Sequence, residues 1–244
     1  MKWIYLSPHL DDAVYSCGSL IHQQMRSGLH VEIWTIFAGY PPSLDFSPFA
    51  QAIHARWGTG AASIAARRSE DTSACARLGA IPFYFDFLDI IYRTHPLTGL
   101  SEIVENDDLF RGYQDSDFIL RQAITRCLQE KLAGLEDTQL VVPLGLGNHV
   151  DHALVRRAAE ELTSPFPLGY YADFPYVMKA ESEVDVPFEQ NYPVLEQDVA
   201  AWGDAITLYS SQVSTFWQNE AQMREELSLY GQKGGGSRLW FQDQ

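Results

Sequence analysis

Two short clusters of histidine and aspartate follow apolar runs that are typical of buried strands. The run Trp3–Leu6 ends in Ser7-Pro8-His9-Leu10-Asp11-Asp12, and the run Leu140–Pro143 leads through a glycine-bearing loop to His149-Val150-Asp151-His152. In an open α/β sheet, the catalytic crevice lies beyond the carboxyl ends of the strands, where side chains from separate loops meet. We therefore expect the two clusters to converge in one site.

The residue types in these clusters indicate a metal site. A catalytic zinc ion takes three protein ligands from His and carboxylate groups and leaves one position for water. His9, Asp12 and His152 supply such a set. Because a bound metal lowers the pKa of water to about 7, a neighbouring carboxylate need only accept a proton, and Asp11 is the natural general base. Such mixed sites also accept Fe²⁺ or Co²⁺, so the sequence leaves the identity of the ion open.

Each acidic residue, considered singly, also admits a purely structural role. Asp11 or Asp12 could cap the following helix by accepting hydrogen bonds from its first amides, and Asp12 could both cap and bind metal. Capping does not explain why two such clusters occur in a chain with 7 His among 244 residues. The unclustered histidines, His22, His30, His54 and His95, are interpreted as surface or partly buried groups. His54 and His95 lie in expected loops and could also contact a ligand.

These motifs resemble those of the PIG-L/LmbE-like family of zinc-dependent N-deacetylases. The first family motif is similar to Ser7-Pro8-His9-Leu10-Asp11-Asp12-Ala13, with Leu10 where proline is common and Ala13 where glutamate is common. The second, H-x-D-H, matches His149-Val150-Asp151-His152. Weaker similarity occurs at Arg67-Arg68-Ser69-Glu70-Asp71 and at Tyr209-Ser210-Ser211-Gln212, so the resemblance covers nearly the whole chain.

The resemblance implies a role for each residue of the two clusters. His9, Asp12 and His152 would bind the metal, and Asp11 would act as base. His149 would face the developing oxyanion or protonate the leaving amine. Asp151 would then bond the other ring nitrogen of His149 and fix its tautomer, because a catalytic imidazole needs such a partner.

The resemblance also implies an arginine that reaches the substrate. Either Arg67 or Arg68 could be that residue. Each could equally be a solvated charge on a helix, paired with Glu70 or Asp71 three or four residues further on. The spacing alone does not decide between them.

The order of expected elements predicts a Rossmann-like three-layer α/β/α fold with a mostly parallel sheet and a single domain over residues 1–244. A strand at 2–7, a helix at 12–27 and a strand at 30–37 form the βαβ opening. Further strands are expected at 83–85, 139–143 and 169–171, and further helices at 62–78, 114–132 and 151–162. The first turn has no G-x-G-x-x-G, so dinucleotide binding is not expected.

The long connections between the expected elements show little hydrophobic periodicity. Segments 39–60 and 88–108 show no clear period and are expected to be loops, and we predict that the loops at 39–60 and 88–112 select the substrate. Gly234-Gly235-Gly236 is expected to be a flexible joint before a terminal strand or turn at 239–241.

Aromatic residues are concentrated near the expected site. Six Trp, 12 Tyr and 13 Phe occur in the chain. Several fall in expected loops, where they could stack on a sugar ring or simply anchor the loops: Phe46, Phe49, Trp57, Tyr92, Tyr113 and Tyr176.

Composition excludes several classes of partner. The chain has 17 Lys+Arg against 32 Asp+Glu, a net charge of −15, which opposes binding to nucleic acid or to an anionic membrane. No stretch reaches the about 20 apolar residues of a membrane span, and no signal peptide is recognised, so we expect a cytoplasmic location. Cys17, Cys75 and Cys127 are expected to be reduced thiols with mostly apolar neighbours.

Together these expectations predict a zinc-dependent N-deacetylase, which hydrolyses a non-peptide amide in a small N-acetylated sugar or glycoside. N-acetylglucosamine-containing molecules are the usual substrates of the family that the chain resembles. Two alternatives stay open: a catalytically silent sugar-binding protein that retains the metal pocket, and a hydrolase of a non-sugar amide or ester. Asp11 and His149 argue against the silent protein, because a purely binding pocket has no evident need for a base and an acid there. A homo-oligomer is compatible with the sequence.

Overall fold

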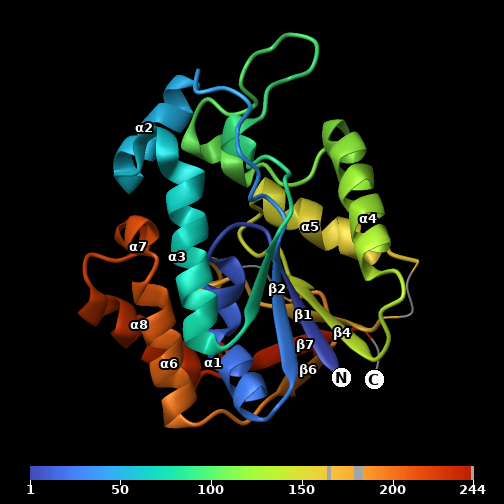
Figure 1. Cartoon of the computed structure of the whole chain (residues 1–244), viewed down its shortest axis with the longest axis vertical. Coiled ribbons are helices and arrows are strands. Elements are labelled where there is room, and N and C mark those ends of the chain that lie inside the picture. Colours follow the sequence, from blue (N-terminus) through green and yellow to red (C-terminus); the bar gives the residue numbers. More distant parts are fainter. Residues whose placement is uncertain (164–165, 179–183, 243–244) are drawn as a thin grey trace.

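A seven-stranded sheet forms the centre of the computed structural model, which describes residues 1–163, 166–178 and 184–242 (Figure 1). The strands are β1 (Lys2–Ser7), β2 (His30–Thr35), β3 (Ile81–Tyr84), β4 (Thr138–Pro143), β5 (Leu168–Tyr171), β6 (Phe188–Asn191) and β7 (Arg238–Phe241). Their order across the sheet is β3-β2-β1-β4-β5-β7-β6. Strands β1 to β5 pair in parallel, whereas β7 is antiparallel to β5 and β6. The predicted mostly parallel sheet is confirmed.

Helices cover both faces of this sheet. They are α1 (Asp12–Arg26), α2 (Pro48–Trp57), α3 (Ser63–Leu78), α4 (Phe118–Leu132), α5 (Val150–Glu160), α6 (Glu196–Thr207), α7 (Ser210–Phe216) and α8 (Glu220–Gln232). Helix α1 packs against α3 and α6 on one face, and α4 packs against α5 on the other (Figure 1). This is the predicted three-layer arrangement. Within the described part of the chain, every helix is too short or too polar to span a bilayer.

The first strand shows why the chain forms a sheet that is buried on both faces. Successive side chains of a strand point to opposite faces, and β1 is apolar at both sets of positions. Trp3 and Tyr5 belong to the core beneath α1, α3 and α6, whereas Ile4 and Leu6 belong to the core beneath α4 and α5. All four side chains are buried. The run therefore forms a central strand, as parallel sheets require.

The topology leaves a crevice between the ends of β1 and β4. Strand β1 lies between β2 and β4, and the chain continues from β1 toward β2 but from β4 toward β5. The connections after these two strands therefore lead away from each other. An open α/β sheet binds its ligands at such a switch point. Both His/Asp clusters follow these two strands, which confirms that they share one edge of the sheet.

The expectation that 39–60 is a loop is wrong in part. Helix α2 occupies much of this segment, and its N-cap Ser47 accepts a hydrogen bond from the Ala50 amide at 3.2 Å. Pro48 fills the first helical position, where its missing N–H is not needed. The segment 88–108 likewise contains the 3₁₀ turn η2 (Ile90–Tyr92) and the start of a second, η3 (Asn106–Phe110).

The sequence did not reveal the elements between β5 and β7. Strand β6 and helices α6, α7 and α8 all lie there. The motif that begins at Tyr209 docks this region onto α3: the Tyr209 hydroxyl donates to Asp71 at 2.7 Å, and the Ser211 amide donates to Glu70 at 2.9 Å. Glu70 and Asp71 are therefore used to hold α7, and neither is paired with Arg67 or Arg68 by a direct hydrogen bond.

The predicted flexible joint at Gly234–Gly236 is instead a tightly packed turn. A Cβ atom added to Gly236 would lie 2.6 Å from the Trp202 ring, and one added to Gly235 would lie 2.4 Å from Tyr230. Gly236 also has a φ of +74°, a conformation that side chains disfavour. The glycines therefore allow close packing rather than motion, and the terminal strand expected at 239–241 follows as β7.

Candidate metal and catalytic site

In the turn after β1, the carboxylates of Asp11 and Asp12 do not cap helix α1. Ser7 performs that task, because its hydroxyl accepts the Ala13 amide at 3.0 Å and donates to the His9 carbonyl at 2.6 Å. Asp11 occupies the N-cap position, but its side chain makes no capping hydrogen bond. The Asp12 carboxylate accepts the His9 amide at 2.8 Å. The purely structural interpretation of Asp11 and Asp12 as caps of α1 is therefore not what the structure shows.

The second cluster begins at the first residues of α5. Gly145 and Gly147 adopt positive φ angles in the preceding turn. His149 is the N-cap of α5, and its Nδ1 accepts the Asp151 amide at 3.2 Å. His152 is the third residue of α5 and is 1% exposed. The turn thus directs two imidazoles toward the end of β1.

Three potential ligand atoms meet where the clusters converge. Asp12 Oδ2 lies 3.1 Å from His9 Nδ1 and 3.2 Å from His152 Nε2. Ligands held 2.0–2.1 Å from a tetrahedral zinc ion lie roughly 3.3 Å apart. His152 Nε2 is buried and makes no hydrogen bond, which a lone pair directed at a cation would explain. Asp12 Oδ2 therefore lies close enough to each of the two histidines to share a divalent ion with it.

Two other sets of side chains could hold an ion in this region. His9, His149 and His152 offer one, and His9, Asp89 and Asp151 offer another. The first is disfavoured because His149 uses the lone pair of Nδ1 for the Asp151 amide, so its neutral ring carries a proton on Nε2. The second is disfavoured because Asp151 already accepts three hydrogen bonds.

We expected the Asp151 side chain to pair with His149, and the structure shows that it does not. Its carboxylate lies 3.0 Å from His9 Nε2 and accepts Arg93 Nη2 at 2.7 Å and the Ile90 amide at 3.1 Å. Burial raises the pKa of Asp151, but Arg93 and His9 outweigh it and hold the pKa below its usual range. The Asp151 carboxylate therefore orients His9, while only the backbone amide of Asp151 contacts His149.

His149 is a neutral hydrogen-bond donor in this arrangement. Burial lowers its pKa well below the usual value, and the neighbouring imidazoles of His9 and His152 lower it further. The rings of His9 and His149 lie edge to face, with their centroids 4.9 Å apart. Because Nδ1 accepts the Asp151 amide, the remaining N–H of His149 is on Nε2.

Asp11 lies beside a buried arginine. Arg67 Nη2 is 3.6 Å from Asp11 Oδ2, and Arg67 Nη1 is 3.8 Å from Asp89 Oδ2. Burial, reinforced by the charge of Asp12, raises the pKa of Asp11 to about 7, although Arg67 opposes the shift. A carboxylate with a pKa in this range can exchange a proton near neutral pH.

The structure separates the two candidate arginines. Arg67 is 4% exposed, and its guanidinium lies 4.6 Å from the centre of the Trp57 ring. Arg68 instead donates twice to the Ala38 carbonyl, at 2.9 and 2.6 Å, and once to Asp86 at 3.0 Å. Arg68 therefore holds the segment after β2, and the prediction of substrate contact now rests on Arg67.

Three residues of the site were missed by sequence reasoning. Asp89 and Arg93 flank η2, in a segment without a periodic pattern, and no sequence signal marked them. Asp173 lies 2.6 Å from His152 Nδ1. It follows β5, the neighbour of β4 in the sheet. The rule that strand ends share one edge could therefore have identified it.

The loop aromatics fall into two groups by what they contact. Phe46 packs edge to face on His54 with centroids 4.6 Å apart, and His54 Nε2 lies 2.7 Å from the Tyr92 hydroxyl. This group anchors the loops and also accounts for His54. Tyr176 instead lies beside His152, with ring centroids 5.7 Å apart, and Phe110 covers His149 at 5.6 Å.

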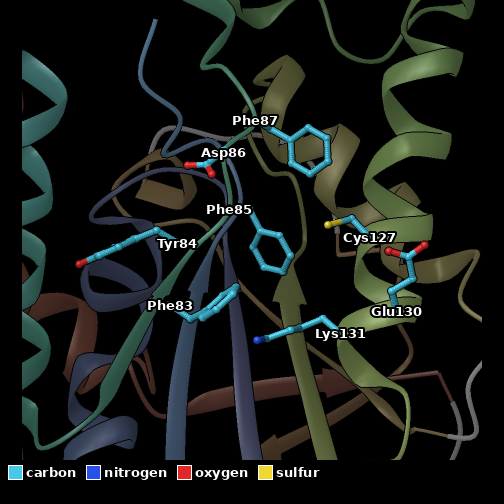
Figure 2. Close-up of a pocket in the computed structure, with 8 residues that line it drawn as sticks. All are labelled: Phe83, Tyr84, Phe85, Asp86, Phe87, Cys127, Glu130 and Lys131. Atoms are coloured by element: carbon cyan, nitrogen blue, oxygen red, sulfur yellow. The ribbon is translucent and has the colours of Figure 1, made fainter.

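A separate pocket lies between β3 and α4, at the edge of the sheet. Figure 2 shows the phenylalanine rings of Phe83, Phe85 and Phe87 on one side and Cys127 and Lys131 on the other. Its volume is about 550 Å³. No residue of either His/Asp cluster lines it, so it is not part of the site.

Replacing the proposed ligands should remove metal without unfolding the protein. We expect His9→Ala and His152→Ala to lose bound zinc, measured by metal analysis after dialysis, because each removes one of three ligands. His149→Ala should retain zinc, as should the control His95→Ala, which alters an exposed residue. Loss of zinc from His149→Ala to the same extent as from His152→Ala would make His149 a ligand and contradict the assignment.

A family model and several known proteins match this chain. The family model described as PIG-L, GlcNAc-PI de-N-acetylase, matches residues 4–163. A 2'-N-acetylparomamine deacetylase of Niallia circulans is 30% identical over 174 residues, which cover 64% of this chain and 60% of that protein. The match thus spans about three fifths of the length of this curated relative.

Solved structures extend the similarity to nearly the whole chain. The zinc inhibited form of the teicoplanin deacetylase Orf2 has a TM-score of 0.86 and 27% identity, with 98% of this chain and 97% of that chain covered. The A40926 pseudoaglycone deacetylase Dbv21 has a TM-score of 0.79 and 27% identity, with 98% and 96% covered. Because the family model spans most of the chain and these structures share its fold, the protein belongs to the PIG-L family.

Proposed function

We propose that this protein is a metal-dependent hydrolase that removes an N-acetyl group from a small substrate containing an amino sugar. The observation that carries the proposal is the convergence of a three-ligand set, a free carboxylate and a neutral imidazole donor at one sheet edge. The relatives described above are named as deacetylases of acetylparomamine, teicoplanin and the A40926 pseudoaglycone, which supports the same reaction class here.

His9, Asp12 and His152 would hold the metal. Zinc suits two imidazoles and one carboxylate, and the same donors accept ferrous iron or cobalt. A bound divalent ion supplies Lewis acidity, which polarises a carbonyl oxygen and makes a water molecule more acidic. Asp151 and Asp173 would orient the two histidines through the ring nitrogens that do not face the ion.

Asp11 would act as the general base. Its carboxylate is not used for capping, so its oxygens are available to take a proton from the attacking water. Arg67, 3.6 Å away, would hold the Asp11 side chain in place. The proton could then pass from Asp11 toward the leaving amine as the amide bond breaks.

His149 would stabilise the negative charge that develops on the carbonyl oxygen. The Asp151 amide fixes the ring so that the Nε2–H group faces the site. A donor that is already oriented costs no reorganisation when charge develops, which is why such groups contribute strongly to catalysis. Because this ring is neutral, it has no acidic proton to give, so the leaving amine would take its proton from Asp11.

The loops predicted to select the substrate form a groove beside this site. The groove has a volume of about 1090 Å³ and is lined from both loop segments and from α4, with Phe46, Leu88, Arg93, Leu100, Val104 and Ile119 among its residues. Val104 and Ile119 are 78% and 72% exposed, and exposed apolar surface of this kind often marks a binding site. Arg93 lines the groove and donates a hydrogen bond to Asp151 of the candidate site. We infer that the groove receives an apolar part of the substrate beyond the sugar.

Removing the base should slow turnover without loss of metal. Asp11→Asn keeps the size of the side chain but cannot accept a proton, so kcat on an N-acetylglucosaminide should fall by about 10²–10⁴. Asp86→Asn, which changes an exposed aspartate, is the matched control. Amine release and zinc content are measured together.

Each other outcome of this experiment has a defined meaning. Wild-type turnover in Asp11→Asn would remove Asp11 from the mechanism, and loss of zinc would make it a ligand. A wild-type protein that binds N-acetylated sugars but releases no amine from any of them would contradict the proposed hydrolase and favour the silent binding protein.

The groove predicts a preference that can be measured on paired substrates. Octyl N-acetylglucosaminide should have a higher kcat/KM than free N-acetylglucosamine. Ile119→Glu and Val104→Glu should reduce that ratio about 10-fold, as expected for the loss of one partly buried apolar contact. Leu97→Glu is the control, because Leu97 is 90% exposed and lies outside the groove lining. An equal effect of all three substitutions would contradict the assignment of the groove.

A further inference from the structure

Asp173 is a buried carboxylate with two directed contacts. It follows β5 and is 1% exposed. Its Oδ1 lies 2.6 Å from His152 Nδ1, and its Oδ2 accepts the Leu146 amide at 2.9 Å. The Phe174 amide, next in the chain, donates to Ser16 in α1 at 3.1 Å. These contacts hold the Asp173 carboxylate between His152 and the Leu146 amide.

The contact with His152 decides which ring nitrogen keeps its proton. A carboxylate only accepts hydrogen bonds, so His152 Nδ1 must donate. When a cation binds, the proton that leaves is therefore the one on Nε2. That nitrogen faces Asp12 and makes no hydrogen bond.

The contact with Leu146 ties the same carboxylate to the second cluster. Leu146 lies in the glycine turn between Gly145 and Gly147, which leads directly to His149. One side chain therefore fixes both the ring of His152 and the turn that presents His149.

We propose that Asp173 is a positioning residue that selects the Nδ1-protonated form of His152 and so sets the affinity of the metal site. The inference rests on the metal site of the proposed function, but not on its substrate. An acceptor in this position typically raises metal affinity by 10–100-fold, because it fixes both the tautomer and the orientation of the ligand.

The isosteric substitution distinguishes positioning from simple packing. In Asp173→Asn, if the amide oxygen accepts the Leu146 amide, the NH₂ group faces His152 Nδ1 and favours a lone pair there. The proton then stays on Nε2, where it blocks metal binding. In Asp173→Ala, the ring of His152 is free to adopt either form. Positioning therefore predicts that Asn weakens zinc binding at least as much as Ala, whereas packing alone predicts that Asn is nearly neutral.

The test measures zinc affinity by competition with a chromophoric chelator. We expect Asp173→Asn to raise the Kd for Zn²⁺ about 10–100-fold, with Asp173→Ala no worse. Asp185→Asn, whose side chain is exposed and pairs with Arg156, should leave the Kd unchanged. A Kd for Asp173→Asn within twofold of wild type, or a much larger loss in Asp173→Ala, would overturn the proposal.

A second measurement does not require metal binding, and its wild-type part does not require a stable variant. Nitrogen-15 NMR of the metal-free wild-type protein should show a proton on His152 Nδ1 that exchanges slowly with water, and this signal should disappear in Asp173→Asn. A wild-type His152 without that proton would overturn the role of Asp173. If the proton is present but the wild type does not bind Zn²⁺, the metal step of the proposed function fails instead.

Discussion

The structure depends on how it pairs the charges buried at the ends of β1, β4 and β5. Moving an ion from water into a protein interior costs several kcal/mol unless a partner offsets it. Five aspartates are buried here, at positions 11, 12, 89, 151 and 173, and two arginines, Arg67 and Arg93, are buried beside them. The excess of carboxylates can be offset by protons on His9 and His152 or by a divalent ion. The proposed cation site would therefore also balance the charges buried in the fold.

This balance also explains how six residues from two clusters acquire different tasks. Asp151 is held ionised by Arg93, and it orients His9. Asp11 has Arg67 at the longer distance of 3.6 Å, and its burial raises its pKa. His149 has no carboxylate partner in the described residues and remains neutral, because burial and two neighbouring imidazoles lower its pKa. Environment, rather than residue type, separates the proposed ligands from the proposed base and the proposed donor.

The sequence predicts those features that follow from short-range pattern. The apolar run Trp3–Leu6 and the cluster after it identify a central strand and its functional turn, because both are encoded within a dozen residues. The parallel sheet and the convergence of His9, Asp12 and His152 follow from the rule that strand ends share an edge. The partner of Asp151 could not be predicted, because it depends on how closely the two turns approach. Likewise, only the packing of α3 shows that Arg67, and not Arg68, enters the site. Helix α2 was missed although Ser47-Pro48 marks its start, because aromatic and proline residues obscured its period.

The central claim is that the metal is held by one set of atoms and that Asp11 and His149 are left free for chemistry. A crystal structure of the zinc-loaded protein, with the ion located by anomalous scattering at the zinc edge, tests this directly. We predict one zinc ion bound by His9, Asp12 and His152, with Asp11 and His149 outside its coordination sphere and Asp173 still bonded to His152 Nδ1. Zinc bound by His149, or located between His9, Asp89 and Asp151, would contradict the account.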